Sequence, residues 1–185
     1  LIYTDSLEKP ILFPILTASG KTVTRGYPID PRPHERIDHP HHMGLWFNFG
    51  DVNGLDFWNN SSAITPERKS HYGHISLDSI ILLDPDAGEL ITLSTWKDSQ
   101  NNKLLAERTT YRFGGEGKQN RSIERITHLT ALQQVTLKSN KEGLFAIRVD
   151  RTFEEPDKKP VKRLDAAALP ADEPSVNNEG VNGRY

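Results

Sequence analysis

The chain contains no cysteine among its 185 residues. This absence excludes disulfide bonds, cysteine-ligated zinc, iron–sulfur clusters and thiol nucleophiles. It leaves the cellular compartment open, because a chain without cysteine folds equally well in oxidising and reducing surroundings. Any catalytic site in this protein must therefore be built from other side chains.

A large net charge and a long apolar run are also missing. The 23 Lys and Arg residues stand against 25 Asp and Glu, and the formal charge of −2 supplies no basic surface for a nucleic acid. We therefore expect no nucleic-acid partner. The longest wholly aliphatic run is Ile-Ile-Leu-Leu at residues 80–83, so we expect no transmembrane segment, which needs roughly 20 apolar residues.

Turn residues divide much of the chain into runs typical of antiparallel strands. The predicted strands cover residues 74–83, 89–96, 104–113, 123–137 and 144–153, with shorter ones at 11–16, 21–27 and 45–49. Between them, segments such as Asp-Pro-Asp-Ala-Gly and Asp-Ser-Gln-Asn-Asn supply the Asx turns and positive φ angles that hairpins need. In residues 123–137 the apolar spacing slips to three, which we interpret as a strand with a bulge.

These patterns predict an all-β fold, an antiparallel β-sandwich of residues 1–153 with long loops rich in histidine and tryptophan near its start. The composition changes after Phe153. Residues 154–160 are expected to form a solvated linker and residues 161–169 two helical turns. The chain has no initiator methionine and ends in a polar, glycine-rich stretch, so we expect a fragment in which residues 154–185 lead into further C-terminal strands.

Histidines are concentrated near residue 40. Five of the seven are His34, His39, His41, His42 and His71. Because Pro40 disfavours the helical region for His39, an extended backbone would place His39 and His41 on one side and His42 on the other. Such a pair suits a divalent transition metal. Candidates for a further ligand are Asp38, His71, His74 and Glu107.

Histidine-rich loops also form without a metal, through hydrogen bonds from imidazole to the backbone and to carboxylates. Both interpretations stay open from the sequence. Three charged residues elsewhere are further candidates. Glu107 falls in phase with its neighbours on a predicted strand, and it either faces solvent or acts as a general base with a histidine as the acid. Arg25 and Arg36 either hold a ligand or form surface ion pairs.

A polar and aromatic stretch lies at residues 50–60. Asp51, Asn53 and Asp56 offer oxygens that bind sugar hydroxyls, and Trp58 offers a ring face that stacks on a sugar. Calcium is a rival ligand for these oxygens, although the EF-hand template is not matched. The alternative is a simple Asn-Gly turn with the tryptophans in the core. The motifs of serine hydrolases, phosphate loops and zinc proteases are missing.

Residues 38–47, DHPHHMGLWF, together with the motifs at 50–54 and 56–58, resemble a bacterial family labelled PmoA-like, or methane oxygenase-like. The likeness covers roughly residues 10–153 and departs at Met43, where that family usually has arginine. It implies a secreted β-sandwich, periplasmic or extracellular, similar to the supersandwiches of aldose epimerases and other carbohydrate-active proteins. The label itself implies no oxygenase activity, because particulate methane monooxygenase subunits are embedded in membranes.

Three functions are therefore open. The first is a carbohydrate-active protein that binds a sugar or glycoside in a cleft of residues 34–60, with epimerase-like, mutarotase-like or glycoside-cleaving activity if it is an enzyme. Its candidate catalytic residues are His39, His41, His42, His74 and Glu107, and its candidate substrate-binding residues are Arg25, Arg36, Asp51, Asn53, Asp56 and Trp58. The second is a non-catalytic carbohydrate-binding or structural sandwich. The third is an oxidoreductase with a divalent transition metal on His39 and His41.

Overall fold

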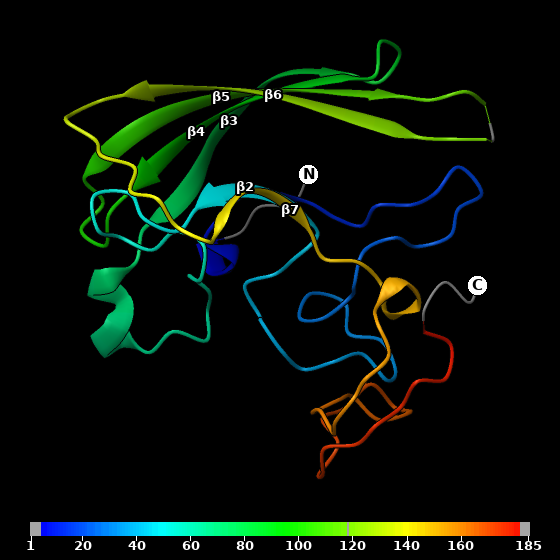
Figure 1. The fold of residues 1–185 in the computed structure, drawn as a ribbon. Coiled ribbons are helices and arrows are strands. Elements are labelled where there is room, and N and C mark those ends of the chain that lie inside the picture. The colour runs from blue at the N-terminus through cyan, green and yellow to red at the C-terminus, as the bar shows by residue number, and fades with distance from the viewer. Residues whose placement is uncertain (1–4, 118, 182–185) are drawn as a thin grey trace.

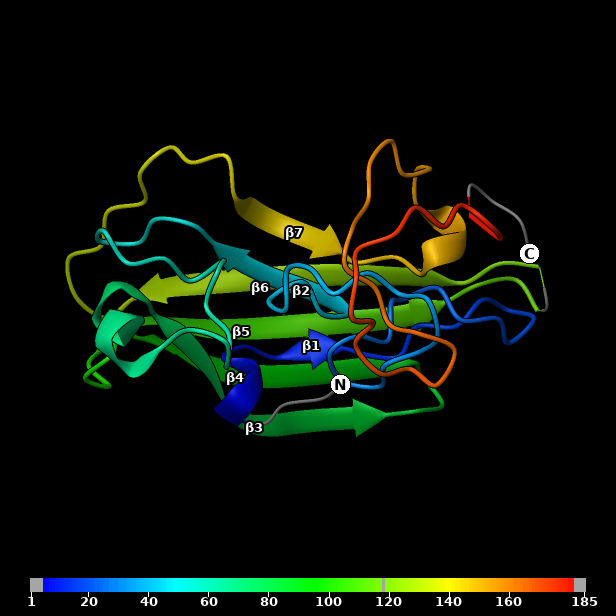
Figure 2. The same cartoon turned by 90° about the horizontal axis from the view of Figure 1, so that it is seen from below.

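The computed structural model describes residues 5–117 and 119–181. The strands are β1 (Ile11–Leu12), β2 (Leu45–Phe49), β3 (His74–Asp84), β4 (Glu89–Lys97), β5 (Lys103–Gly114), β6 (Ser122–Ala131) and β7 (Gly143–Ile147). Short 3-10 helices are η1 (Asp5–Leu7), η2 (Pro66–His71) and η3 (Arg151–Phe153). The strands form two antiparallel sheets packed together, ordered β1-β2-β7 and β3-β4-β5-β6, which confirms the predicted all-β sandwich (Figures 1 and 2).

The larger sheet is a run of hairpins, each closed by the turn chemistry of its own sequence. Between β3 and β4, Asp84 Oδ1 accepts hydrogen bonds from the backbone N–H groups of Asp86 and Ala87. Between β4 and β5, Asp98 accepts from two backbone N–H groups, and Asn101 has a φ of 65°. These local bonds fix the strand ends, so three of the predicted strands appear nearly at their predicted limits.

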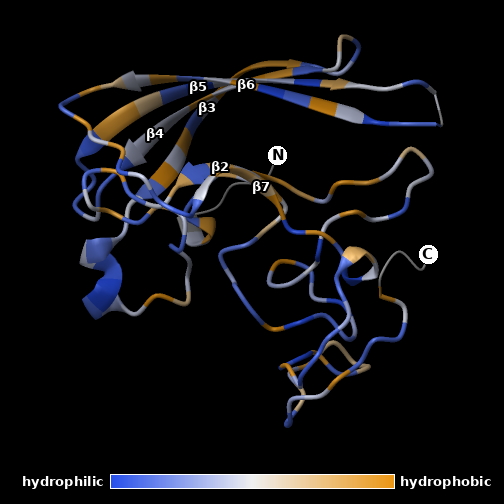
Figure 3. Ribbon diagram, viewed as in Figure 1, coloured by the Kyte–Doolittle hydropathy of each residue, from blue (hydrophilic) through white to orange (hydrophobic). Residues whose placement is uncertain are grey.

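Strand β2 separates two packed layers. Side chains alternate along a strand, so Trp46 and Phe47 point to opposite faces. Phe47 points toward the larger sheet, where its ring centroid lies 6.1 Å from that of the fully buried Trp96. Trp46 packs on the outer face of the smaller sheet in a second cluster with Leu7, Ile11, Met43 and Trp58. Figure 3 shows the hydrophobic residues alternating with hydrophilic ones along the strands, whereas η2 is hydrophilic.

Several predicted strands have different limits. Those at 11–16 and 21–27 reduce to β1 and to isolated bridges. In the first of these segments, Pro14 has no N–H group to continue a ladder. The strand predicted at 123–137 ends at Ala131, and the bulge predicted there is wrong, since its pairing with β5 is continuous. Ile126 simply lies on the other face of β6. The strand predicted at 144–153 divides into β7 and η3.

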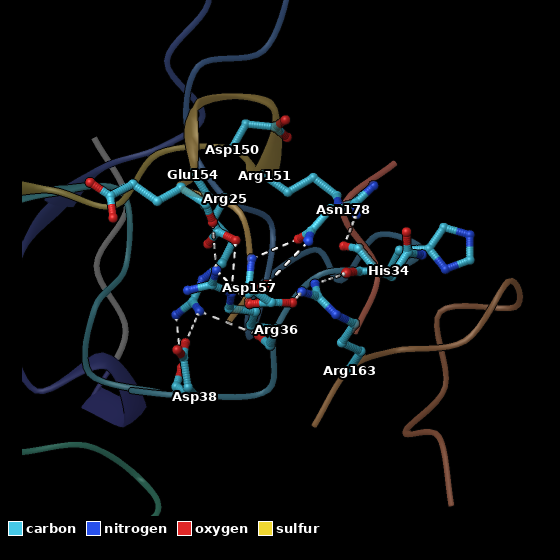
Figure 4. A network of polar contacts seen from close by, with 12 residues as sticks. Arg25, His34, Arg36, Asp38, Asp150, Arg151, Glu154, Asp157, Arg163 and Asn178 are labelled. Atoms are coloured by element: carbon cyan, nitrogen blue, oxygen red, sulfur yellow. Dashed lines mark hydrogen bonds and ion pairs between the residues drawn. The ribbon is translucent and has the colours of Figure 1, made fainter. Parts of the chain in front are cut away.

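The predicted solvated linker at residues 154–160 is exposed over most of its length, but two of its side chains are anchored to the rest of the fold. The Asp157 side chain is 2% exposed and pairs with Arg36 and with Arg163. Arg36 also pairs with Glu154, at 3.1 Å between Nε and Oε2. Figure 4 shows these side chains converging from segments far apart in the sequence. Residues 154–157 are therefore anchored to the loop between β1 and β2, although the division into domains 1–153 and 154–185 stays a prediction.

The two helical turns predicted at 161–169 are wrong. The backbone N–H of Leu164 donates to the Glu35 carbonyl oxygen, and Arg163 forms an isolated bridge with Arg36. Asp165 then folds a turn by accepting from the N–H groups of Ala167 and Leu169. Pairing with residues 35–36 satisfies backbone groups that a two-turn helix would leave unbonded at its ends. Among the helices in the described ranges, none is long and apolar enough to cross a membrane.

Candidate metal centre

The histidines near residue 40 lie on a β-turn. The His42 N–H donates to the His39 carbonyl oxygen at 2.9 Å, and Pro40 takes the second position of the turn. His39 has a φ of 43°, in the left-handed region. The extended arrangement predicted for this segment is therefore wrong, because Pro40 not only disfavours a helix but is also a preferred turn residue.

The turn brings three imidazoles together. The ring centroids of His39 and His42 are 4.7 Å apart and those of His41 and His42 are 4.3 Å apart. One ligand nitrogen from each of the three residues lies within 4.8 Å of the others. Within residues 5–117 and 119–181, no other group of three or more His, Cys, Asp or Glu side chains is arranged so that it could hold a metal ion. His42 thus joins the predicted pair of His39 and His41.

Two buried cations hold the turn in place. Arg25 is 1% exposed and donates to the carbonyl oxygens of Asp38, His39 and His42 at 3.0, 3.1 and 3.3 Å. It also pairs with the Asp38 carboxylate. Lys9 is likewise 1% exposed and donates to the His41 carbonyl oxygen at 2.8 Å. Arg25, predicted to hold a substrate, instead fixes the backbone that carries the imidazoles.

Burial and nearby positive charge keep two of the imidazoles neutral. Burial, followed by the charges of Lys9 and His39, lowers the pKa of His41 from 6.5 to about 4. Burial, followed by the neighbouring imidazoles and Arg148, lowers the pKa of His42 to about 3. Burial also lowers the pKa of Lys9 to about 7. At pH 7 His41 and His42 are uncharged, which is the form of histidine that binds a metal.

Trp58 lies in the core beside the cluster. Its Nε1–H donates to His42 Nε2 at 3.2 Å, and its ring centroid is 5.3 Å from that of Trp46. His42 stacks on Trp46, with centroids 5.1 Å apart. Trp58 is 6% exposed, so its faces pack against protein groups and leave no open surface for a sugar. Of the two interpretations of the tryptophans, the core position is the one that the structure adopts.

The other predicted substrate-binding residues shape loops. Asp51 accepts from the Gly54 N–H, and the amide of Asn53 bonds to the backbone of residues 134 and 136. Asp56 accepts from the backbone and side chain of Asn59. Arg36 is committed to the C-terminal ion pairs described above. These residues therefore stabilise local structure, and the structure does not gather them around the imidazoles.

Glu107 lies on the other side of the smaller sheet from the histidine turn. It is 5% exposed inside the sandwich, where it accepts from Trp96 Nε1 at 2.7 Å and pairs with Arg125 at 2.5 Å. Arg125 lies 4.8 Å from the ring centroid of Phe47, on the face opposite to Trp46 and His42. Strand β2 thus separates Glu107 from the imidazoles, and the acid–base pair predicted between them is not formed.

His71 and His74 are also apart from the turn. His71 ends η2, and its backbone oxygen accepts from the Asp56 N–H. His74 begins β3 opposite Lys97. Asp38, the remaining candidate for a further ligand, lies next to His39 but is paired with Arg25 and Arg148. The cluster therefore consists of imidazoles alone.

Two residues of this centre escaped the sequence analysis. Lys9 lies 32 positions before His41, so no spacing links it to the histidines. Arg148 follows β7, and its Nη2 lies 2.9 Å from Asp38 Oδ1 and 3.2 Å from Glu154 Oε1. The sequence nevertheless holds a clue to the burial of each residue. Lys9 precedes the apolar run at residues 11–13, and Arg148 lies between Ile147 and Val149. Charged residues in such settings are buried only when they are paired.

A small cavity adjoins the turn. It has a volume of about 270 Å³ and shares Pro40 and Met43 with the turn segment. The other lining residues are Ser6, Leu7, Pro28, Ile29, Ser61 and Ser62. Its size lies just below the range of roughly 300–1,000 Å³ that is usual for ligand pockets. Hydroxyl and apolar groups beside a candidate metal centre would suit a small polar organic molecule.

Comparison with known proteins identifies the family of this chain but no activity. No curated protein and no solved structure matches the chain. The resemblance to PmoA-like proteins and to epimerase supersandwiches is not tested by these findings, so both stay predictions. One family, described as a family of unknown function (DUF6807), matches residues 2–184. That match spans nearly the whole chain, and the protein belongs to this family.

Proposed function

We propose that this protein is a metal-dependent enzyme that binds a divalent transition metal through His39, His41 and His42. A single observation carries the proposal: one nitrogen from each imidazole lies within 4.8 Å of the others, on a turn fixed by Arg25 and Lys9. Two of the three imidazoles are neutral at pH 7, as metal ligands must be.

The fit requires two local changes. Nitrogens that share a metal at about 2.1 Å lie closer together than 4.8 Å, so the imidazoles must turn toward one another when a metal binds. The Trp58 bond to His42 must also open. If Nε2 of His42 binds the metal, it cannot accept from Trp58; if Nδ1 binds, Nε2 carries the proton and again cannot accept.

Three imidazoles leave coordination positions open. A metal held in this way would act as a Lewis acid or activate a bound water, and a redox-active metal would also transfer electrons. Arg25 and Lys9 keep the ligand-bearing backbone in place. We propose a sugar or related hydroxylated molecule as the substrate class, supported by the serine-containing cavity next to Pro40 and Met43. The resemblance noted above supports the same substrate class and an extracytoplasmic location.

The metal content of the protein tests this proposal. The chain is purified without a metal-affinity tag, and bound metals are measured by elemental mass spectrometry. We expect close to one transition metal per chain in the wild type and a loss of that metal in His39→Ala/His41→Ala. His128→Ala is the matched control, because this exposed histidine lies on β6 away from the turn. Wild-type protein without metal, even after incubation with zinc, would overturn the proposal.

A structural role for the histidines is the second candidate. The hydrogen bond from Trp58 to His42 favours it, because it shows one imidazole nitrogen already used within the fold. On this view the turn supports a non-catalytic carbohydrate-binding or structural sandwich. The double histidine variant would then melt at a lower temperature while metal content stays at the background level in both proteins.

A further inference from the structure

We infer that the metal centre binds an anionic ligand whose carboxylate is held by Arg148. This inference rests on the proposed metal function and names the ligand class of that same site. A hydroxylated acid, such as a hydroxy acid or a sugar acid, would place its carboxylate on the guanidinium and its hydroxyl at the metal. The argument starts from how Arg148 is bonded.

Arg148 has one terminal nitrogen to spare. Its Nη2 is shared between Asp38 Oδ1 and Glu154 Oε1, and its Nε is buried without a hydrogen-bond partner. Within the described ranges, no hydrogen bond or ion pair involves Nη1. The side chain is 18% exposed, so part of it faces solvent. A guanidinium with a free N–H edge is the preferred protein partner of a carboxylate.

The position of Arg148 relates it to the imidazoles. Its backbone N–H donates to the Gly44 carbonyl oxygen, two residues after His42. Its side chain shares the Asp38 carboxylate with Arg25, the residue that fixes the turn. Arg148 therefore lies against the segment that carries the imidazoles, which is why we place the ligand's carboxylate there.

The charges around the turn favour an anion. Arg25 and Arg148 both pair with Asp38 directly before the turn, and Lys9 donates to the His41 carbonyl oxygen. Asp38 is shared by these two arginines, and Glu154 is shared with Arg36, so neither carboxylate is reserved for Arg148. A divalent metal adds further positive charge. A bound carboxylate would offset this excess, so metal and anion should strengthen each other's binding.

Lactate and its neutral analogue lactamide are suitable probes, because they differ in the carboxylate alone. Their binding to zinc-loaded protein is measured by calorimetry at low chloride, with zinc content determined on the same samples. We expect wild-type protein to bind lactate at least tenfold more tightly than lactamide. Arg148→Gln should lose this preference, and Arg148→Lys should keep part of it. Arg112→Gln, which removes an exposed arginine from the larger sheet, should bind lactate like the wild type.

The outcomes separate this inference from the proposed function. Zinc-loaded wild type that binds lactate and lactamide equally, or Arg148→Gln that keeps the wild-type preference, would overturn the anion site while the metal centre stands. Protein that holds no zinc but binds lactate through Arg148 would support the anion site and reject the metal function. Protein that holds neither zinc nor lactate would reject both. Thermal melting of each variant checks that it is folded.

Discussion

Single buried charges decide what the histidine turn can do, and Lys9 is the clearest example. Its ammonium is taken out of water, which is costly unless other groups compensate. Compensation comes from the His41 carbonyl oxygen, from the ring of Trp46 at 5.8 Å and from the charges of Glu8 and Asp56. It is incomplete, because burial still lowers the pKa of Lys9 to about 7. Lys9 therefore makes the stability of the fold depend on pH.

Removing this ammonium should abolish that dependence. Lysine in the unfolded chain has a pKa of 10.5, so between pH 7 and pH 9.5 the unfolded state binds more protons and stability rises with pH. The rise for metal-free wild type should be on the order of 3 kcal/mol, from roughly 1.4 kcal/mol per pH unit. Lys9→Met should lack this slope, whatever its absolute stability. Urea denaturation at a series of pH values measures both slopes, and equal slopes would contradict the prediction.

The hydrogen bond between Trp58 and His42 should weaken zinc binding, so its removal should raise the zinc affinity. Because metal binding has to open this bond, Trp58→Phe should bind zinc more tightly than the wild type, by about fivefold if the bond contributes about 1 kcal/mol. Competition with a fluorescent chelator measures the zinc affinity. Trp46→Phe is the control, since Trp46 stacks on His42 without a hydrogen bond between them. Unchanged or weaker binding by Trp58→Phe would contradict the prediction that metal binding opens this bond.

At the scale of elements, short-range chemistry explains what the sequence could predict. Strands β3, β4 and β5 were predictable because their turns carry their own Asp and Gly residues. The pairing of residues 163–164 with 35–36 was not, because it joins segments far apart in the chain. The same limit applies to the site. The three histidines are neighbours in sequence, whereas Lys9, Arg25 and Arg148 reach them only through the fold.

The histidine turn should depend on the shape of Arg25 as well as its charge. Its Nη2 donates to the carbonyl oxygens of Asp38, His39 and His42, and its Nη1 donates to the Arg36 carbonyl oxygen and the Asp38 carboxylate. One ammonium group cannot cover this set of acceptors. Arg25→Lys should therefore lower zinc affinity at least tenfold and also lower the melting temperature. Arg125→Lys is the matched control: this arginine is buried too, but it lies with Glu107 on the other face of β2. The Arg125→Lys variant should lose stability and keep the zinc affinity of the wild type. Equal zinc affinities in all three proteins would refute a role for Arg25 in positioning the ligands.

At the scale of the whole molecule, the sandwich keeps two polar systems apart. Glu107 and Arg125 lie between the sheets, and the histidine turn lies beyond the outer face of β2. A strand pattern alone could not have shown this, because Trp46 and Phe47 are adjacent in sequence and point in opposite directions. The loop that carries the turn is in addition pinned from the far end of the chain, where Asp157 pairs with Arg36 and Arg163.

Breaking this last contact should release the C-terminal segment without emptying the metal centre. Asp157→Asn leaves two largely buried guanidiniums without their shared carboxylate, and loss of one partner from a buried ion pair costs about 3–5 kcal/mol. We expect a lower melting temperature and faster tryptic cleavage after Lys158 and Lys162, followed by mass spectrometry; the bond after Lys159 resists trypsin because Pro160 follows it. Asp172→Asn, at an exposed position of the same segment, should behave like the wild type. Because His39, His41 and His42 are held by Arg25 and Lys9, zinc content should stay near the wild-type level. A variant that melts and is cleaved like the wild type would show that the C-terminal segment is anchored by other contacts.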